Sequence, residues 1–270
     1  MKTIFLLLSI SQFAWANDST QFSFKWFPNE KKVSIFTGDS RAHRLGFSRN
    51  FDESSYGVSM GNIFPVVNIN KGKYTAQINA AGSTYLTLLR LNQAGSVLNS
   101  DYFADVFVDF ASKSSPFIIR LGTGHSSQHL SDDAIYNNKL PYQNYAKDYH
   151  QIMGIYQSKN RHILAYLGLQ YNYNFKTIGN ISNKALWQLG FVNYPFKNKM
   201  LAPFFYAGDL KLREELNYDY TFNCQIGYAF KNEFDHAIRI ALNYSDGIDE
   251  RGYFHPNKRQ FMHLGIYFEY

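Results

Sequence analysis

Cysteine and long apolar runs are both scarce in this chain. Cys224 is its single cysteine, so no intrachain disulfide can stabilise the fold. Beyond residue 16, no apolar run approaches the roughly 20 residues that a membrane-spanning helix needs. The sequence therefore excludes a fold stapled by its own disulfides and a membrane protein built from apolar helices.

The first residues have the features of a secretory signal peptide. Lys2 supplies a positive charge, residues 4–13 are apolar, and residues 14–16 (AWA) form a small-x-small cleavage site. We therefore expect cleavage before Asn17 and export from the cytoplasm. The net charge of +6 would suit an anionic partner, but nucleic acid is not expected as a partner of an exported chain. Phosphate-bearing lipid and general surface charge remain as explanations.

Aromatic residues are abundant, with 24 Phe and 21 Tyr, although the mean hydropathy is negative. An exported chain of this composition is typical of a barrel whose strands alternate lipid-facing and lumen-facing residues. Every second residue near the C-terminus is apolar, namely Met262, Leu264, Ile266, Phe268 and Tyr270. This resembles the final strand that outer-membrane barrels present to the barrel assembly machinery. We predict an all-β fold, a transmembrane antiparallel β-barrel of about 12 strands in a Gram-negative outer membrane.

Connection lengths predict which way the strands run. The connections alternate between short links, at 112–115, 159–161, 196–199 and 231–234, and long links, at 128–147, 175–183, 213–219 and 245–259. Barrels of this class keep short turns in the periplasm and long loops outside, so strand 117–127 should run outward.

The chain divides into three parts on this interpretation. Residues 1–16 are the signal peptide, and residues 17–55 are an irregular segment that is periplasmic or plugs the lumen. Residues 56–270 form the outer-membrane barrel. We expect outer-membrane lipid and the barrel assembly machinery as partners.

Residues 116–133, PFIIRLGTGHSSQHLSDD, combine a regular strand with a polar end. Alternation puts Phe117 and Ile119 on the lipid side, and continuing it puts His125 and Ser127 there too, at the extracellular end. On the lumen side, alternation places Asp101, Asp105 and Asp109 beside Arg120. We expect an ion-pair network there that keeps the polar interior satisfied.

His125 and Ser127 are residue types that can perform nucleophilic catalysis. An imidazole that removes the serine proton makes a nucleophile, provided that a third group orients the ring. Asp148, at the start of the returning strand, is our preferred third residue because a carboxylate can hold a histidine tautomer. Asn137 and Asn138 are alternatives for the third residue.

His-x-Ser on a barrel strand resembles two enzyme families, outer-membrane phospholipase A and an outer-membrane lipid A deacylase. The resemblance rests on His125 and Ser127 together with the architecture. It implies hydrolysis of acyl esters by a lipid-facing Ser–His pair, helped by an Asn or Glu on the following strand. Lys139 stands at the spacing where those families place the third residue.

A longer pattern resembles the bacterial family catalogued as domain of unknown function 1207. It comprises HSSQHLSDD (125–133), VLNSDYFAD (97–105) and GDSRAHR (38–44). The hallmark of that family is a His-x-Ser-Ser-His-Leu-Gly-Asp-Glu string, from which this chain departs at Gln128, Ser131 and Asp133. The resemblance implies an outer-membrane setting and supplies no activity.

Three hypotheses remain open for this string. In the first, the protein is a structural or pore-type barrel, and His129, Asp132 and Asp133 latch the long connection 128–147 to the barrel. In the second, it is a lipid-acting serine hydrolase with Ser127 as nucleophile, His125 as general base and Asp148 orienting the base.

The third hypothesis is a metal site, because His125 and His129 with the two aspartates are ligand types. Residues four apart on a strand lie about 13 Å from each other, so the chain would have to turn between them. We expect neither a metal nor a cofactor.

Overall fold

The computed structural model describes residues 21–91, 94–136, 145–176, 185–195, 203–231, 237–251 and 257–269. The signal peptide therefore lies outside the described residues. The strands of the described part are β1 (Ser23–Trp26), β2 (Leu45–Asn50), β3 (Ser55–Lys71), β4 (Tyr74–Leu91), β5 (Ala94–Ser112), β6 (Phe117–Leu130), β7 (Tyr145–Gln157), β8 (Ile163–Lys176), β9 (Ala185–Asn193), β10 (Phe204–Arg213), β11 (Asp219–Lys231), β12 (Ala237–Ile248) and β13 (Lys258–Glu269).

Two short helical segments occur in the described part, α1 (Asp132–Tyr136) and the 3-10 turn η2 (Glu214–Leu216). Within the described ranges, no helix is long and apolar enough to cross a membrane.

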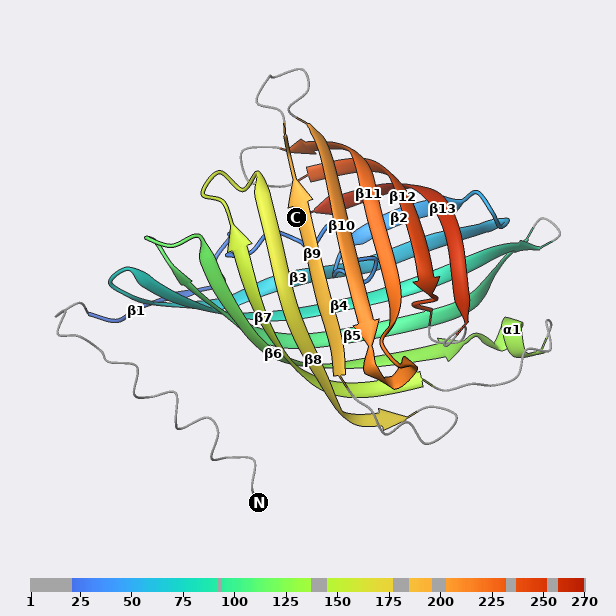
Figure 1. Cartoon of the computed structure of the whole chain (residues 1–270), viewed down its shortest axis with the longest axis horizontal. Helices are drawn as coiled ribbons and strands as arrows, with labels where there is room; N and C mark the ends of the chain where they lie inside the picture. The colour runs from blue at the N-terminus through green and yellow to red at the C-terminus, as the bar shows by residue number, and fades with distance from the viewer. Residues whose placement is uncertain are drawn as a thin grey trace.

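The strands form one closed antiparallel barrel (Figure 1). From β3 to β13, each strand pairs with the next along the chain, and β2 pairs with both β3 and β13 to close the cylinder. All thirteen described strands except β1 belong to this ring, so the barrel has twelve strands. The predicted all-β barrel of about 12 strands is confirmed.

The N-terminal strands differ from the boundary that we drew at residue 56. Both β1 and β2 lie within 17–55, and β2 completes the barrel. β1 pairs with Val67–Asn70 of β3, whereas β2 pairs with Tyr56–Ser59 farther along the same edge. β2 escaped sequence analysis because only six residues form it and its outward face carries Arg49 besides Leu45 and Phe47.

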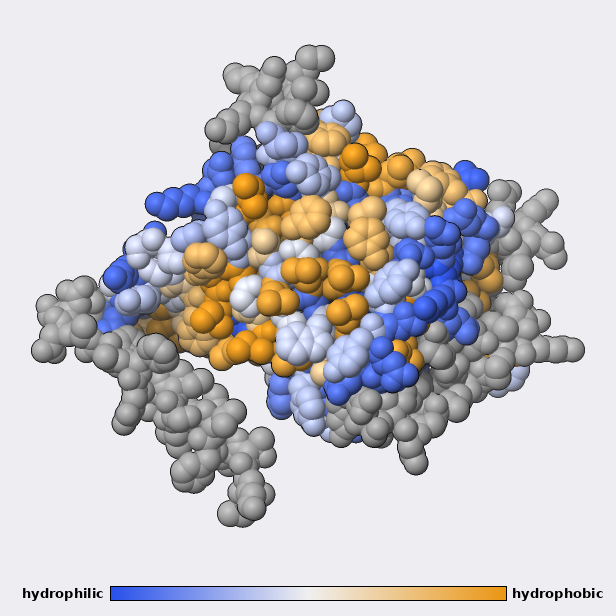
Figure 2. Space-filling view, in the orientation of Figure 1, coloured by the Kyte–Doolittle hydropathy of each residue, from blue (hydrophilic) through white to orange (hydrophobic). Residues whose placement is uncertain are grey.

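Side chains alternate between the outside and the lumen as expected. On β6, Phe117 and Ile119 are 65% and 54% exposed, while Ile118 and Arg120 between them are buried. Figure 2 shows apolar side chains gathered across the middle of the visible face, with hydrophilic ones toward its two ends. The apolar outer surface suits contact with hydrocarbon. The closed barrel suits it too, because all of its described strands are paired and no sheet edge leaves backbone groups without hydrogen bonds.

The stretch Lys31–Arg44, which we call the lumen segment, runs through the interior between β1 and β2. Val33 and Phe36 on it are buried, and the Phe36 ring stacks on Tyr166 of β8 with centroids 4.0 Å apart. Burying side chains of this size contributes about 1.5–3 kcal/mol each. The segment is therefore packed as part of the core and fills the barrel.

Candidate functional site

The candidate catalytic residues lie on the outside of β6 and β7, near the end opposite the short turns. In the antiparallel register His125 stands directly opposite Asp148, and Ser127 opposite Ala146. Ser126 and Gln128, which alternate with them, are buried toward the lumen. The structure thus places His125 and Ser127 on the outer side of the barrel wall, in agreement with the alternation.

A chain of polar contacts joins His125 to two neighbouring strands. His125 Nδ1 lies 2.6 Å from Asp148 Oδ1, and the two side chains are 52% and 28% exposed. Asn174 on β8 donates its Nδ2 hydrogen to Asp148 Oδ2 over 2.6 Å. Asp148 is therefore within reach to orient the His125 ring, and Asn174 holds the carboxylate. Asn174 is of a residue type that can serve as the third residue beside a Ser–His pair. Sequence analysis did not identify it because it lies far from His125 in the chain.

Ser127 makes a different contact from the one that we expected. Its Oγ is hydrogen-bonded to His129 Nε2 and not to His125. Ser127 lies two residues from each histidine on the same side of β6, so either ring can reach it. His125 is turned toward β7 by Asp148, whereas His129 lies beside Tyr102 of β5, with ring centroids 6.1 Å apart.

We call His125, Ser127, His129 and Asp148 the outward cluster. The other candidate third residues, Asn137 and Asn138, lie outside the described residues, as does Lys139. At the start of the long connection after β6, Asp132 is exposed, and the side chain of Asp133 lies outside the described residues. Leu130 packs with Leu98 and Ala134, and Ser131 Oγ bonds Val97 O and accepts from Ala134 N.

No group of three or more His, Cys, Asp or Glu side chains that could hold a metal ion occurs in the described ranges. His125 and His129 are engaged instead by Asp148 and Ser127.

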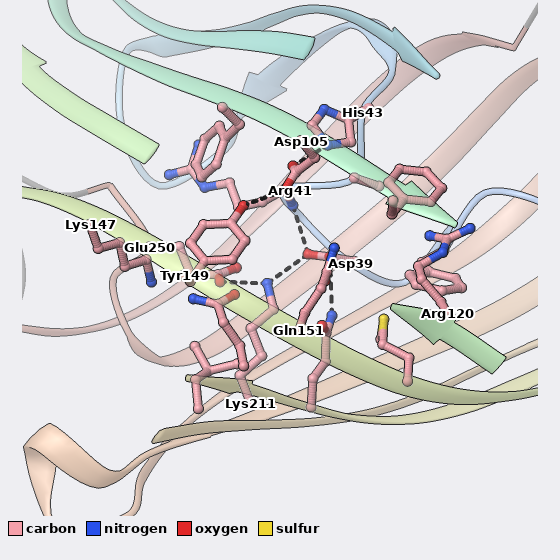
Figure 3. A pocket seen from close by; sticks show the side chains of 18 of the residues that line it. Asp39, Arg41, His43, Asp105, Arg120, Lys147, Tyr149, Gln151, Lys211 and Glu250 are labelled. Atoms are coloured by element: carbon pink, nitrogen blue, oxygen red, sulfur yellow. Dashed lines mark hydrogen bonds and ion pairs between the residues drawn. The ribbon is translucent and has the colours of Figure 1, made fainter. Parts of the chain in front are cut away.

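A second polar cluster fills the lumen, centred on the GDSRAHR stretch of the lumen segment (Figure 3). Asp39 accepts a hydrogen bond from Lys211 Nζ of β10 at 2.6 Å. Arg41 pairs with Asp101 of β5 at 3.0 Å. His43 Nε2 lies 2.7 Å from Asp105 Oδ2, and its Nδ1 lies 3.1 Å from Ser83 Oγ.

The expected lumenal ion pairs are present, although most have partners that sequence analysis missed. Arg120 binds Asp109 with two contacts, Nε–Oδ1 at 2.7 Å and NH2–Oδ2 at 3.0 Å. Asp101 and Asp105 instead face the lumen segment. The density of polar residues in GDSRAHR was a signal, but nothing local in the sequence names partners that far away.

Glu250 lies in the long connection between β12 and β13 and reaches into the lumen from the end of the barrel that carries the long connections. Its Oε1 accepts from Lys211 at 2.7 Å and from Arg213 at 3.2 Å, and its Oε2 bonds Ser40 of the lumen segment. Burial acts to raise the pKa of Glu250, but the nearby cations outweigh it and hold that pKa well below its usual range. The pKa of Arg41 lies above its usual value, because the attraction of Asp101 and Glu250 outweighs the effect of burial.

Small cavities remain in the lumen. Two of them, of about 130 and 120 Å³, lie beside the lumen segment, and the lining of the first includes Asp39, Arg41, Lys147, Tyr149, Lys211 and Glu250. Phe107 and Tyr166 also project inward and are 2% exposed. The geometry is that of a filled barrel with a charged interior.

Comparison with known proteins agrees with this architecture. A family model described as "Protein of unknown function (DUF1207)" matches residues 34–270. No curated protein matches the chain significantly.

Among solved structures, the Salmonella typhi outer membrane phospholipase dimer with bound calcium is 12% identical. It has a TM-score of 0.52, with 84% of this chain and 90% of that one covered. Outer membrane phospholipase A from Escherichia coli is also 12% identical, with a TM-score of 0.51 and coverage of 84% and 95%. At this identity the likeness concerns the fold.

Proposed function

Because the chain belongs to the DUF1207 family, whose description assigns no activity, function has to be argued from the site, and we propose that this protein is a lipid-acting serine hydrolase of the outer membrane. Its substrates are acyl esters of membrane lipid, of the phospholipid or lipid A class. The resemblance of the barrel to outer-membrane phospholipase supports the location and is compatible with the activity.

The observation that carries this proposal is the His125 Nδ1–Asp148 Oδ1 contact of 2.6 Å on the outward face, beside Ser127. A carboxylate on Nδ1 fixes the tautomer whose Nε2 is free to accept a proton, and it stabilises the imidazolium that forms. Ionic contacts that only keep a barrel interior satisfied belong in the lumen. This contact faces the side from which a lipid ester would arrive.

We assign Ser127 as nucleophile, His125 as general base and Asp148 as the residue that orients the base. Ser127 Oγ attacks the ester carbonyl, His125 takes the hydroxyl proton, and the alcohol part leaves with a proton returned from His125. Water then releases the fatty acid from Ser127. The acyl chain would lie along Phe117 and Ile119, which continue the same face of β6.

His129 holds Ser127 in a resting arrangement in this proposal. Rotation about the Cα–Cβ bond of Ser127, between staggered rotamers, turns Oγ from His129 toward His125. The two histidines therefore have separable roles. Removing His125 removes the base, whereas removing His129 frees the nucleophile.

The decisive experiment measures fatty acid release from phospholipid and from lipid A by purified protein in mixed micelles. Ser127→Ala should abolish release, and His125→Ala and Asp148→Asn should each lower kcat about 10²–10⁴-fold. His129→Ala should retain most of the activity. Ser126→Ala is the matched control, because this neighbouring serine is buried on the lumen side.

Equal release by wild type and Ser127→Ala would contradict the hydrolase. A loss with His129→Ala that matches the loss with Ser127→Ala, while His125→Ala stays active, would transfer the role of base to His129.

A structural barrel without chemistry is the second candidate, favoured by the filled lumen. The lumen segment and Glu250 occupy the interior, which argues against a wide pore. In this case the wild type and every variant of the outward cluster would release fatty acid only at background level. The same assay therefore separates the two candidates.

A further inference from the structure

The short-turn end of the barrel carries a continuous row of basic side chains. Backbone hydrogen bonds tie its turns together, from Lys113 N to Lys73 O at 2.9 Å and from Gln157 N to Pro116 O at 2.8 Å. Lys73, Lys113 and Lys159 are exposed on three successive turns. The three ammonium groups therefore lie along one rim.

We call this set the basic rim, which consists of Lys25, Lys71, Lys73, Lys113, Lys159 and Arg161. Its charge is poorly balanced, because Glu30 is the one exposed acidic residue among the described residues of this end. Burial lowers the pKa of Lys32, Glu30 acts to raise it, and Arg161, Lys113 and Lys25 lower it further.

Acidic residues are concentrated at the opposite end. Its connections expose Asp52, Glu53 and Asp132, against the exposed cations Arg49 and Lys258. The described surface of the short-turn end is thus the more cationic of the two ends, which uniform surface charge for solubility would not require.

Exposed aromatic rings lie beside the cations of the basic rim, and two of them flank Lys25 on β1. Phe24 and Trp26 of β1 are 62% and 66% exposed, and Phe117 at the start of β6 is 65% exposed. Lys73 Nζ lies 5.4 Å from the centroid of the Tyr74 ring. Aromatic residues of this kind occupy the level of the lipid headgroups in membrane proteins.

We propose that the basic rim binds the phosphates of anionic phospholipids in the leaflet next to the short turns. Passing from the turn at Lys113 along β6 toward mid-barrel, the protein presents a cation, then the Phe117 ring, then aliphatic side chains such as Ile119. A phospholipid presents its phosphate, its interfacial region and its acyl chains in that same order. A soluble acidic partner would match the cations but not the aromatic and apolar bands that follow them.

This inference is independent of the hydrolase, since the basic rim and the outward cluster lie at opposite ends of β6. Each lysine near an anionic membrane surface strengthens binding about fivefold, so several together give a large preference for anionic lipid.

The test uses the folded full-length protein in neutral detergent and measures binding of dioctanoyl phosphatidylglycerol and dioctanoyl phosphatidylcholine by native mass spectrometry. We expect the anionic lipid to bind about tenfold or more tightly. The quadruple variant K25Q/K73Q/K113Q/K159Q should lose this preference, and K25R/K73R/K113R/K159R should keep it. R49Q/K258Q is the matched control, because it removes exposed cations at the opposite end.

Heat-modifiable migration on gels shows that each variant folds. Equal binding of the two lipids, or a preference that survives the glutamine variant, overturns the proposal. Competition by inorganic phosphate as strong as that by the anionic lipid would show an unspecific phosphate site. Preferential competition by a polyglutamate peptide would show an acidic protein partner, and either result also overturns the lipid assignment.

Discussion

At Gly38, the backbone of the lumen segment lies very close to the backbone of the barrel wall. A Cβ atom on Gly38 would lie 2.6 Å from the carbonyl carbon of Gly208 in β10. The Gly208 backbone cannot yield, because it is held in register on both sides by β9 and β11. Glycine is therefore needed for the segment to lie against the wall.

We expect Gly38→Ala to lower the free energy of unfolding by about 1–3 kcal/mol, because overpacking forces the segment off the wall. Urea unfolding in detergent, followed by tryptophan fluorescence, measures this. Gly154→Ala is the matched control, since a Cβ there meets nothing within 4 Å. Equal unfolding midpoints for the two variants would show that the segment does not pack on Gly208.

Among the elements, the lumen segment is the one that crosses the barrel interior. Asp39, Arg41 and His43 bind strands on different sides of the lumen, at Lys211, Asp101 and Asp105. Removing one partner of a buried charged pair typically costs about 3–5 kcal/mol. These contacts therefore hold the segment across the interior.

In planar bilayers we expect the wild type to show no sustained pore current, because the lumen is filled. The triple variant D39A/R41A/H43A should show frequent openings, since the segment loses its anchors. R49Q/K258Q, which leaves the lumen untouched, should behave as wild type. A steady current through wild-type protein would refute the filled lumen.

At the scale of the whole molecule, the alternation of short and long connections predicts the orientation in the membrane. The short turns should face the periplasm and α1 the outside. Single cysteines introduced in a Cys224→Ser background test this, as Ser114→Cys at a short turn and Tyr136→Cys in α1, whose side chain is 77% exposed in the native protein.

A membrane-impermeant maleimide should label Tyr136→Cys in intact cells and Ser114→Cys only after the outer membrane is permeabilised. The reverse result would invert the barrel and place the basic rim in the outer leaflet. It would also place the outward cluster toward the periplasmic leaflet, where the substrate would be phospholipid.

The sequence by itself determined the class of fold, the facing of each regular strand and the family. Alternation is a local property, since neighbouring residues on a strand point to opposite sides. Alternation therefore predicts that Phe117 and Ile119 face outward and that Arg120 faces the lumen, without knowledge of any partner. The same rule placed His125 and Ser127 outward.

Only the tertiary structure decided which groups meet. Closure by the short strand β2, the contact of Ser127 with His129, and the support of Asp148 by Asn174 all depend on register and side-chain direction. The position of the lumen segment depends most on register and side-chain direction, because its sequence has no regular alternation of apolar residues. Its fixation rests on charged partners such as Lys211 that lie far away in the chain and that only a closed barrel brings to its centre.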